Sequence, residues 1–357
     1  MGKQSILVVD DVRANLDVIV GILSSDYQVL AATSGKIALD IIEQVAELPD
    51  LILLDIVMPD MDGFSVCRLL KSNLRTLKIP IIFLTGRIEE ADEERGLAAG
   101  AVDYISKPIR PGIVKARIKT HLALYDQTRL LEDLVRERTR EVSVTQDVVI
   151  HGLASLAETR DNETGRHLQR TQQYVKTLAL ELQKKPAYRS TLCDSTIDLM
   201  YKSAPLHDIG KVGIPDRILL KPGKLTAEEF EIMKAHPLLG RDAISDAEQH
   251  LGSSSFLSIA REIAHTHHEK WDGTGYPQGL KGTDIPLSGR LMALADVYDA
   301  LITRRVYKPA FSHETAKAII LEGQGSHFDP EIVTAFLNQE ETFIQIAERL
   351  VDEVSCL

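Results

Sequence analysis

The chain has 357 residues and an ordinary globular composition, with 44% hydrophobic and 26% charged residues. This length predicts two or more domains, and the composition excludes a chain that is disordered throughout. The formal net charge of -11 argues against DNA binding and against a polybasic membrane anchor.

The cysteines and the apolar runs narrow the class of protein further. Cys67, Cys193 and Cys356 lie far apart, which excludes a disulfide framework and a paired-cysteine metal site. The best apolar run, residues 51–58, is interrupted by Asp55 and falls short of the roughly 18 residues of a membrane span. The first residues lack the apolar core of a signal peptide. We therefore expect a cytoplasmic protein without membrane insertion.

Strand and helix patterns alternate over residues 1–120. The strands are expected at 5–10, 27–33, 51–56, 80–85 and 102–105, and the helices at 12–25, 36–47, 64–72, 89–99 and from about 110. Five such units in succession predict an α/β domain with a doubly wound, five-stranded parallel sheet.

A long helical pattern follows at 121–161, without proline and with dense charge. Residues taken from Leu124 at alternating steps of four and three form a heptad pattern of mainly apolar side chains. The pattern is imperfect because Arg138 occupies one of its positions. Two interpretations remain open: a connector helix packed on its own domain, or a two-stranded coiled coil that joins two chains. We favour the second, and so expect a linker helix at 121–150 and a homodimer.

The rest of the chain has mainly helical patterns separated by glycine and proline loops. It predicts an all-α domain over 151–345 and a short tail at 346–357, with helices at 168–182, 227–235, 259–268, 290–301 and 314–321.

Polar side chains stand at the carboxyl ends of the expected parallel strands, where ligands bind in open sheets. These residues are Asp10 and Asp11, Asp55, Thr85 and Lys107. Clustered carboxylates favour Mg²⁺, and a lysine and a threonine can contact phosphoryl oxygens. Asp55 is then the nucleophile that takes a phosphoryl group.

Residues 1–120 resemble the receiver domain of two-component response regulators. The resemblance is carried by ILVVDD (6–11), LLDIVMPDMDG (53–63), FLTG (83–86) and SKP (106–108). It implies that Asp55 is the phosphoacceptor and that Asp10, Asp11 and Asp55 hold Mg²⁺. It also implies that Thr85, Tyr104 and Lys107 form the switch, and that a sensor histidine kinase is the partner.

Histidines and acids from five separate segments form a second candidate site. The group comprises Glu163 and His167, His207 and Asp208, His236, His267 and His268, and Asp296. Neighbours within a helix point about 100° apart, so adjacent pairs suit only a ligand lodged between helices. A cluster of two or more metal ions meets that requirement.

Imidazole and carboxylate donors without thiolate suit Fe, Mn, Zn or Ni, and a carboxylate such as Asp208 can bridge two ions. Two ions about 3.5–4 Å apart can share a hydroxide and clamp a phosphate oxygen. The chemistry predicted is phosphoester hydrolysis at His207 and Asp208, with Lys211 neutralising the phosphate. Trp271 and Tyr276 offer faces for a base, although their composition alone favours simple anchoring of a loop.

Residues 145–345 resemble the HD-GYP family of metal-dependent phosphohydrolases. The resemblance is carried by HDIGKVGIPD (207–216), LLKPGKLT (219–226) and HHEKWDGTGYP (267–277). It implies hydrolysis of cyclic di-GMP to linear pGpG, with onward cleavage to GMP left open. The implied metal ligands are Glu163, His167, His207, Asp208, His236, His267, His268 and Asp296.

The same resemblance implies two or three ions, with Fe or Mn favoured over Zn or Ni, and the third ion held through Glu163. Tyr276, Arg305 and Lys308 match positions that contact substrate. Together the two resemblances describe a phosphorylation-regulated cyclic di-GMP phosphodiesterase. Two alternatives stay open: another substrate such as cyclic GMP-AMP, and a signalling adaptor that binds a partner such as a diguanylate cyclase without turnover.

Overall fold

The structure is a computed structural model that describes residues 3–86, 95–96, 98–160, 165–251, 255–303 and 310–351. The chain divides into two compact units, Met1–Arg140 and Glu141–Leu357. None of the described helices is both long enough and apolar enough to cross a membrane.

The first unit is built on a parallel sheet of five strands in the order β2-β1-β3-β4-β5. This confirms the predicted α/β fold class. The strands are short and the central ones are entirely buried, which matches their continuous apolar sequences. Their bounds are β1 Ser5–Val9, β2 Gln28–Ala32, β3 Leu51–Asp55, β4 Ile81–Thr85 and β5 Asp103–Ser106.

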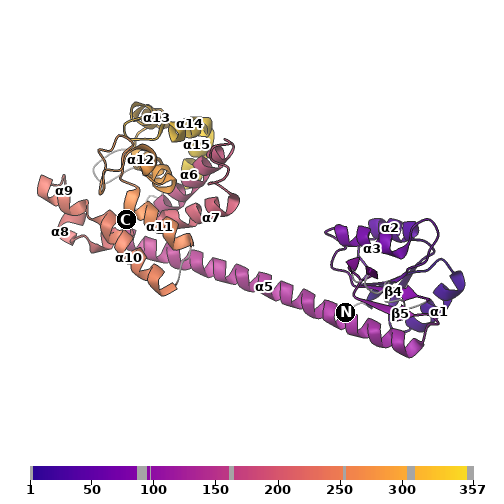
Figure 1. Ribbon diagram of the computed structural model, residues 1–357. Coiled ribbons are helices and arrows are strands. Elements are labelled where there is room, and N and C mark those ends of the chain that lie inside the picture. Colours follow the sequence, from indigo (N-terminus) through magenta and orange to yellow (C-terminus); the bar gives the residue numbers. More distant parts are fainter. Residues whose placement is uncertain are drawn as a thin grey trace. The chain divides into compact units, whose positions relative to one another are not determined.

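Helices cover both faces of this sheet (Figure 1). α1 (Arg13–Leu23) and the start of α5 (Pro111–Thr159) pack on one face, and α2 (Gly35–Gln44) and α3 (Gly63–Ser72) on the other. Asp62 caps α3 by accepting a hydrogen bond from the Ser65 amide at 2.8 Å. The helix expected at 89–99 lies largely outside the described residues.

Gly63 allows α3 to begin directly beside the end of β3. A Cβ atom at this position would lie 2.2 Å from the Asp55 carbonyl oxygen, so only glycine fits. The loop that follows the predicted phosphoacceptor is therefore held close to it by backbone contact.

α5 runs without a break from Pro111 to Thr159, so the predicted long helix starts earlier than residue 121. Its first part is held to the rest of the first unit by two ion pairs, Lys115–Asp26 at 2.7 Å and Lys78–Glu132 at 2.6 Å, and by a hydrogen bond between His121 and Asp103 at 3.0 Å. Beyond Glu132 many of its apolar residues are exposed in the single chain, including Val135, Val142, Val149 and Leu156, whereas Ile150, Ala154 and Ala157 are buried.

All named elements of the second unit are helical, as predicted. Several of these helices pack around a core that contains Tyr174, Tyr298, Phe336 and Phe343. The helices are α6 Gly165–Gln183, α7 Asp194–Ser203, α8 Asp216–Leu219, α9 Ala227–Met233, α10 His236–Leu251, α11 Ser255–Thr266, α12 Leu287–Ile302, α13 His313–Glu322, α14 Pro330–Asn338 and α15 Glu340–Arg349, with 3-10 turns η1 Ala204–Leu206, η2 Ile209–Gly213 and η3 Gly282–Asp284.

Candidate functional sites

The acidic site of the first unit forms where β1 and β3 end. Oxygen atoms of Asp10, Asp11 and Asp55 lie within 4.8 Å of one another. Asp10 and Asp55 are buried, and the Lys107 ammonium lies 2.8 Å from Asp10 Oδ2 and 2.7 Å from Asp55 Oδ2. The carboxylates and the lysine predicted from the strand ends are thus side by side.

Hydrogen bonds fix Asp10, and burial sets the acidity of Asp55. The Val12 amide and the Asn15 side chain donate to Asp10 Oδ1 at 2.9 and 3.0 Å. Burial raises the pKa of Asp55 in spite of the neighbouring Lys107 ammonium. Burial would lower the pKa of Lys107, but its bonds to Asp10 and Asp55 outweigh this effect and raise it.

The predicted switch residues lie on neighbouring strands. Phe83 is opposite Tyr104 and Thr85 is opposite Ser106 in the register of β4 and β5. Side chains alternate along a strand, so Thr85 and Tyr104 are on the same face of the sheet. Thr85 is buried beside the acidic site and Tyr104 is partly buried.

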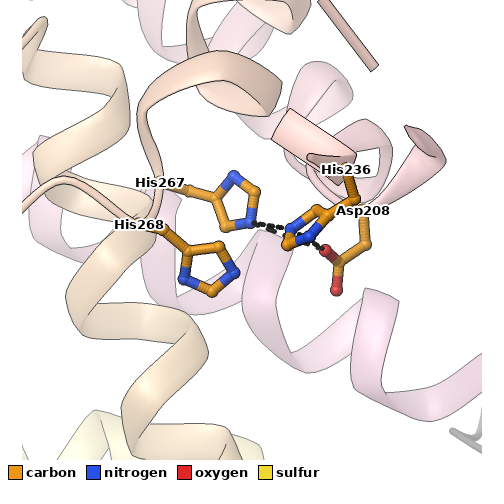
Figure 2. Close-up of side chains that lie close together, drawn as sticks. All are labelled: Asp208, His236, His267 and His268. Carbon is orange, nitrogen blue, oxygen red and sulfur yellow. Dashed lines mark hydrogen bonds and ion pairs between the residues drawn. The ribbon is translucent and has the colours of Figure 1, made fainter. Parts of the chain in front are cut away.

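The second unit brings its predicted ligands together in two adjoining groups. One group comprises His167 from α6, His207 after η1 and Asp296 from α12. The other comprises Asp208, His236, His267 and His268 (Figure 2). Within each group, donor atoms lie within 4.8 Å of one another.

The adjacent ligand pairs lie at helix ends, which differs from the expected helical placement. His207 and Asp208 stand between η1 and η2, and α11 ends at Thr266, just before His267 and His268. At a helix end the backbone leaves the regular 100° step, so neighbouring side chains can turn toward one site. The rings of His267 and His268 are accordingly only 4.1 Å apart, measured between centroids.

Hydrogen bonds to the chain fix the tautomers of three of these histidines. His207 Nδ1 donates to the Ala204 carbonyl at 3.0 Å, and His236 Nδ1 donates to the Met233 carbonyl at 2.8 Å. His267 Nδ1 donates to the Ile263 and Ala264 carbonyls, both at 3.1 Å. A carbonyl can only accept, so Nδ1 carries the proton and the neutral ring presents a lone pair on Nε2.

These lone pairs face one another across short gaps. His236 Nε2 lies 3.4 Å from His267 Nε2, and His207 Nε2 lies 3.5 Å from His167 Nε2. Two unprotonated nitrogens repel at this distance, and a cation between them turns the repulsion into ligation. The donor set therefore fits divalent transition-metal ions.

Asp208 lies between the two groups. Its Oδ1 is 3.2 Å from His236 Nε2, and its Oδ2 is 3.3 Å from His207 Nε2 and 2.8 Å from Lys211 Nζ. Burial would raise the pKa of Asp208, but Lys211 and His207 outweigh this and hold it well below its usual range. A carboxylate whose two oxygens face different donor groups has the arrangement needed to bridge two ions.

The imidazoles differ in their affinity for protons. Burial lowers the pKa of His267, and it lowers that of His268 strongly, so both rings stay neutral and able to ligate. Burial would also lower the pKa of His207, but the adjacent Asp208 carboxylate outweighs it and raises the pKa. Protons therefore compete more strongly for His207 than for His267 or His268.

Two buried residues that were not predicted support His167. Asp299 Oδ2 accepts a hydrogen bond from His167 Nδ1 at 2.8 Å, and Arg170 Nε donates to Asp299 Oδ1 at 2.6 Å. Burial would raise the pKa of Asp299, but these two bonds outweigh it and lower the pKa. The sequence held a signal for both residues. Asp299 lies one helical turn after Asp296, and Arg170 lies one turn after His167, so each shares a helix face with a predicted ligand.

The glycine-rich loop after α11 is held by Glu269. Its buried carboxylate accepts hydrogen bonds from the amides of Gln278 at 2.7 Å and Leu280 at 3.0 Å. The Tyr276 ring stacks on His268 with centroids 4.8 Å apart, and burial raises the pKa of its hydroxyl. The loop thus covers one side of the metal-ligating cluster.

Trp271 fits the anchoring interpretation. Its amide donates to the His327 carbonyl at 3.1 Å, and the Arg290 guanidinium lies 5.7 Å from its ring centroid. Three other predicted site residues, Glu163, Arg305 and Lys308, lie outside the described residues. Their roles stay predictions.

Comparisons with known proteins agree with this division. A family model for the HD domain matches residues 152–332, and one for the response regulator receiver domain matches residues 6–119. A relative from Vibrio cholerae serotype O1, named probable cyclic di-GMP phosphodiesterase, is 54% identical and covers 100% of this chain and 82% of its own length.

Two further relatives extend the comparison. The cyclic di-GMP phosphodiesterase response regulator RpfG of Xanthomonas campestris pv. campestris is 37% identical, over 83% of this chain and 77% of its own length. A 3'3'-cGAMP-specific phosphodiesterase 2 of Vibrio cholerae is 40% identical, over 64% of this chain and 40% of its own length. The chain belongs to the family of response regulators that join a receiver domain to a metal-dependent HD domain.

Proposed function

We propose that this response regulator hydrolyses cyclic di-GMP to linear pGpG, and that phosphorylation of Asp55 regulates the reaction. Hydrolysis is supported above all by the two adjoining groups of metal donors. Nε2 of His236 faces Nε2 of His267 at 3.4 Å, and Nε2 of His167 faces Nε2 of His207 at 3.5 Å. Relatives named cyclic di-GMP phosphodiesterases support the substrate, at 54% and 37% identity over most of the chain.

The chain supplies a defined environment for phosphodiester cleavage. Bound divalent ions would supply Lewis acidity and lower the pKa of water. His167, His207 and Asp296 would hold one ion, and Asp208, His236, His267 and His268 would hold another. We propose Fe or Mn as the native metal, ahead of Zn or Ni, and a third ion held with Glu163.

We propose that Lys211 acts on the substrate phosphate. Its ammonium lies 2.8 Å from Asp208 Oδ2, at the edge of the cluster. A cation at that point can neutralise charge that develops on a phosphate oxygen or on the leaving group. Arg305 and Lys308 are proposed to bind the substrate phosphates.

An aromatic edge beside the cluster can receive a guanine base. Tyr276 stacks on His268, and Phe230, which is 46% exposed, lies with its ring centroid 6.3 Å from that of Tyr276. The Lys234 ammonium lies 5.5 Å from the Phe230 centroid and 5.9 Å from the Tyr276 centroid. A flat purine with hydrogen-bond acceptors suits such an edge.

Regulation is proposed to start at the acidic site of the receiver. A sensor histidine kinase would supply the phosphoryl group and Mg²⁺ would be held by Asp10, Asp11 and Asp55. Thr85, Tyr104 and Lys107 would respond to the phosphate. We propose that the response passes along α5, which begins in the first unit and ends in the second, and that phosphorylation either activates hydrolysis or relieves an inhibition of it.

We also propose that α5 pairs with α5 of a second copy. Val135, Val142, Val149 and Leu156 follow one another at intervals of seven residues, and each is more than half exposed. Sedimentation at micromolar concentration should show a dimer, and Val142→Glu should shift it toward monomer. A wild-type monomer would reject this pairing.

A substrate panel tests the function. Metal-loaded protein should cleave cyclic di-GMP faster than cyclic GMP-AMP and faster than nucleoside triphosphates. Cyclic GMP-AMP is the specific rival, because one relative is named for that substrate. Preferred turnover of cyclic GMP-AMP would replace the substrate. Binding of cyclic di-GMP without turnover, with a diguanylate cyclase retained as partner, would favour the adaptor.

A further inference from the structure

Glu158 is a buried carboxylate beside the metal-ligating cluster and belongs to none of the predicted site residues. It stands in the last turn of α5 and is only 4% exposed. Its Oε1 lies 3.9 Å from His167 Nε2. A charged side chain is seldom buried so completely unless it serves a cation or a hydrogen-bond network.

Glu158 faces His167 Nε2, which presents a lone pair and carries no proton. His167 Nδ1 donates to the Asp299 carboxylate at 2.8 Å, so the neutral ring presents an unprotonated Nε2. Around this nitrogen lie His207 Nε2 at 3.5 Å, Asp296 Oδ1 at 3.7 Å and Glu158 Oε1 at 3.9 Å. Four electron-rich atoms thus converge from four parts of the chain.

A count of charges over both donor groups shows why a further acid is favoured here. When the imidazoles are neutral, Asp208 and Asp296 supply two negative charges in all. Two divalent ions held by the two groups would leave two positive charges in a buried place, which is costly. The Glu158 carboxylate offsets one of them.

We propose that Glu158 is a further acid of the metal centre, and that it serves the divalent transition ion held by His167, His207 and Asp296. Since Glu158 belongs to α5, binding of this ion also fixes the last turn of the helix that begins in the receiver. The proposal rests on the proposed metal centre and does not depend on which nucleotide is hydrolysed.

Metal binding by Glu158→Gln tests this proposal without any substrate. The amide keeps the size of the side chain but removes its charge. Full-length apo protein is dialysed anaerobically against a Mn²⁺ series, and bound metal per chain is measured. We expect one bound ion, the one proposed to be held by His167, His207 and Asp296, to lose affinity about tenfold or more. Glu158→Asp should recover part of this affinity.

Glu262→Gln is the matched control. Glu262 is an acid of the same unit that accepts a hydrogen bond from Ser288 at 2.9 Å, and it should leave Mn²⁺ binding unchanged. Thermal unfolding of each apo protein separates a structural role from a metal role. Unchanged Mn²⁺ affinity in Glu158→Gln, with or without a lower apo Tm, would overturn the proposal. Wild-type protein that binds no Mn²⁺ would instead refute the metal centre on which it rests.

Discussion

The receiver and the HD domain both gather buried carboxylates, but they balance the charge differently. In the receiver the chain supplies its own cation, since Lys107 lies within 2.8 Å of both Asp10 and Asp55. In the HD domain imidazoles predominate, and His236 Nε2 meets His267 Nε2 at 3.4 Å. One lysine, Lys211, forms an ion pair there with Asp208.

This difference shows what each site is suited to do. In the receiver, Lys107 offsets only part of the negative charge of Asp10, Asp11 and Asp55, so the site remains suited to the Mg²⁺ and the phosphoryl group proposed for it. In the HD centre, hydrogen bonds behind the rings of His167, His207, His236 and His267 fix their lone pairs toward the cluster, so it is organised for ions that stay bound. The first arrangement suits a switch and the second suits catalysis.

The largest expected effect comes from removing a ligand of the HD centre. His207→Ala or Asp208→Ala should reduce hydrolysis about a thousandfold or more, because metal-based stabilisation of the transition state amounts to several kcal/mol. The receiver should still be labelled by acetyl phosphate. Retained hydrolysis would overturn the two-ion assignment.

The complementary experiment removes the proposed phosphoacceptor and leaves the HD centre intact. Asp55→Asn should abolish labelling by acetyl phosphate, because the amide is not a nucleophile for phosphoryl transfer. Basal hydrolysis by the metal-loaded protein should persist. Undiminished labelling would show that another residue accepts the phosphoryl group.

A smaller effect is expected from a substitution of Asp299, which accepts the hydrogen bond from His167 Nδ1. Asp299→Asn keeps an oxygen for His167 Nδ1 but loses the charge that supports the ring, so Mn²⁺ affinity should fall roughly tenfold. Equilibrium dialysis of the full chain measures it. Equal affinities in variant and wild type would contradict the role of Asp299.

The aromatic edge should affect substrate binding only. Phe230→Ala should raise KM for cyclic di-GMP about fivefold, the equivalent of about 1 kcal/mol of base stacking. The value of kcat should change little, since Phe230 is not part of the ligand cluster. Leu321→Ala on α13 is a control of similar exposure, at 38%, and should leave KM unchanged. A fall in kcat at constant KM would argue against stacking.

The smallest effect is a pH dependence of receiver stability. Because burial raises the pKa of Asp55 above its ordinary value of 3.8, the folded receiver binds this proton more tightly than the unfolded chain does. The contribution of Asp55 to stability is therefore lost as pH rises through the folded pKa. Without Mg²⁺, Asp55→Asn should raise the receiver Tm by a few degrees at pH 7 and by less at pH 4.5, as followed by calorimetry. An equal gain at both pH values would contradict the raised pKa.

Local sequence patterns determined much of this molecule. The alternation of apolar strands and amphipathic helices in residues 1–120 was sufficient for the parallel sheet, because hydrophobic periodicity follows from local geometry. The acids at the ends of β1 and β3 had to meet, since parallel strands place their carboxyl ends at one edge. In the HD domain, His207-Asp208 and His267-His268 gave the donor types, and the structure brings seven of the eight predicted ligands into two groups.

Tertiary structure alone decided how those donors are used. The tautomer of His167 depends on Asp299, which is 132 residues away, and the two faces of Asp208 are set by α10, η2 and the segment after α11. Glu158 lies beside the cluster because the end of α5 packs against α6 and its neighbours, and no spacing in the sequence signals that contact. Such roles arise from long-range packing, which places groups by shape and burial, whereas sequence periodicity reports only which face of an element is apolar.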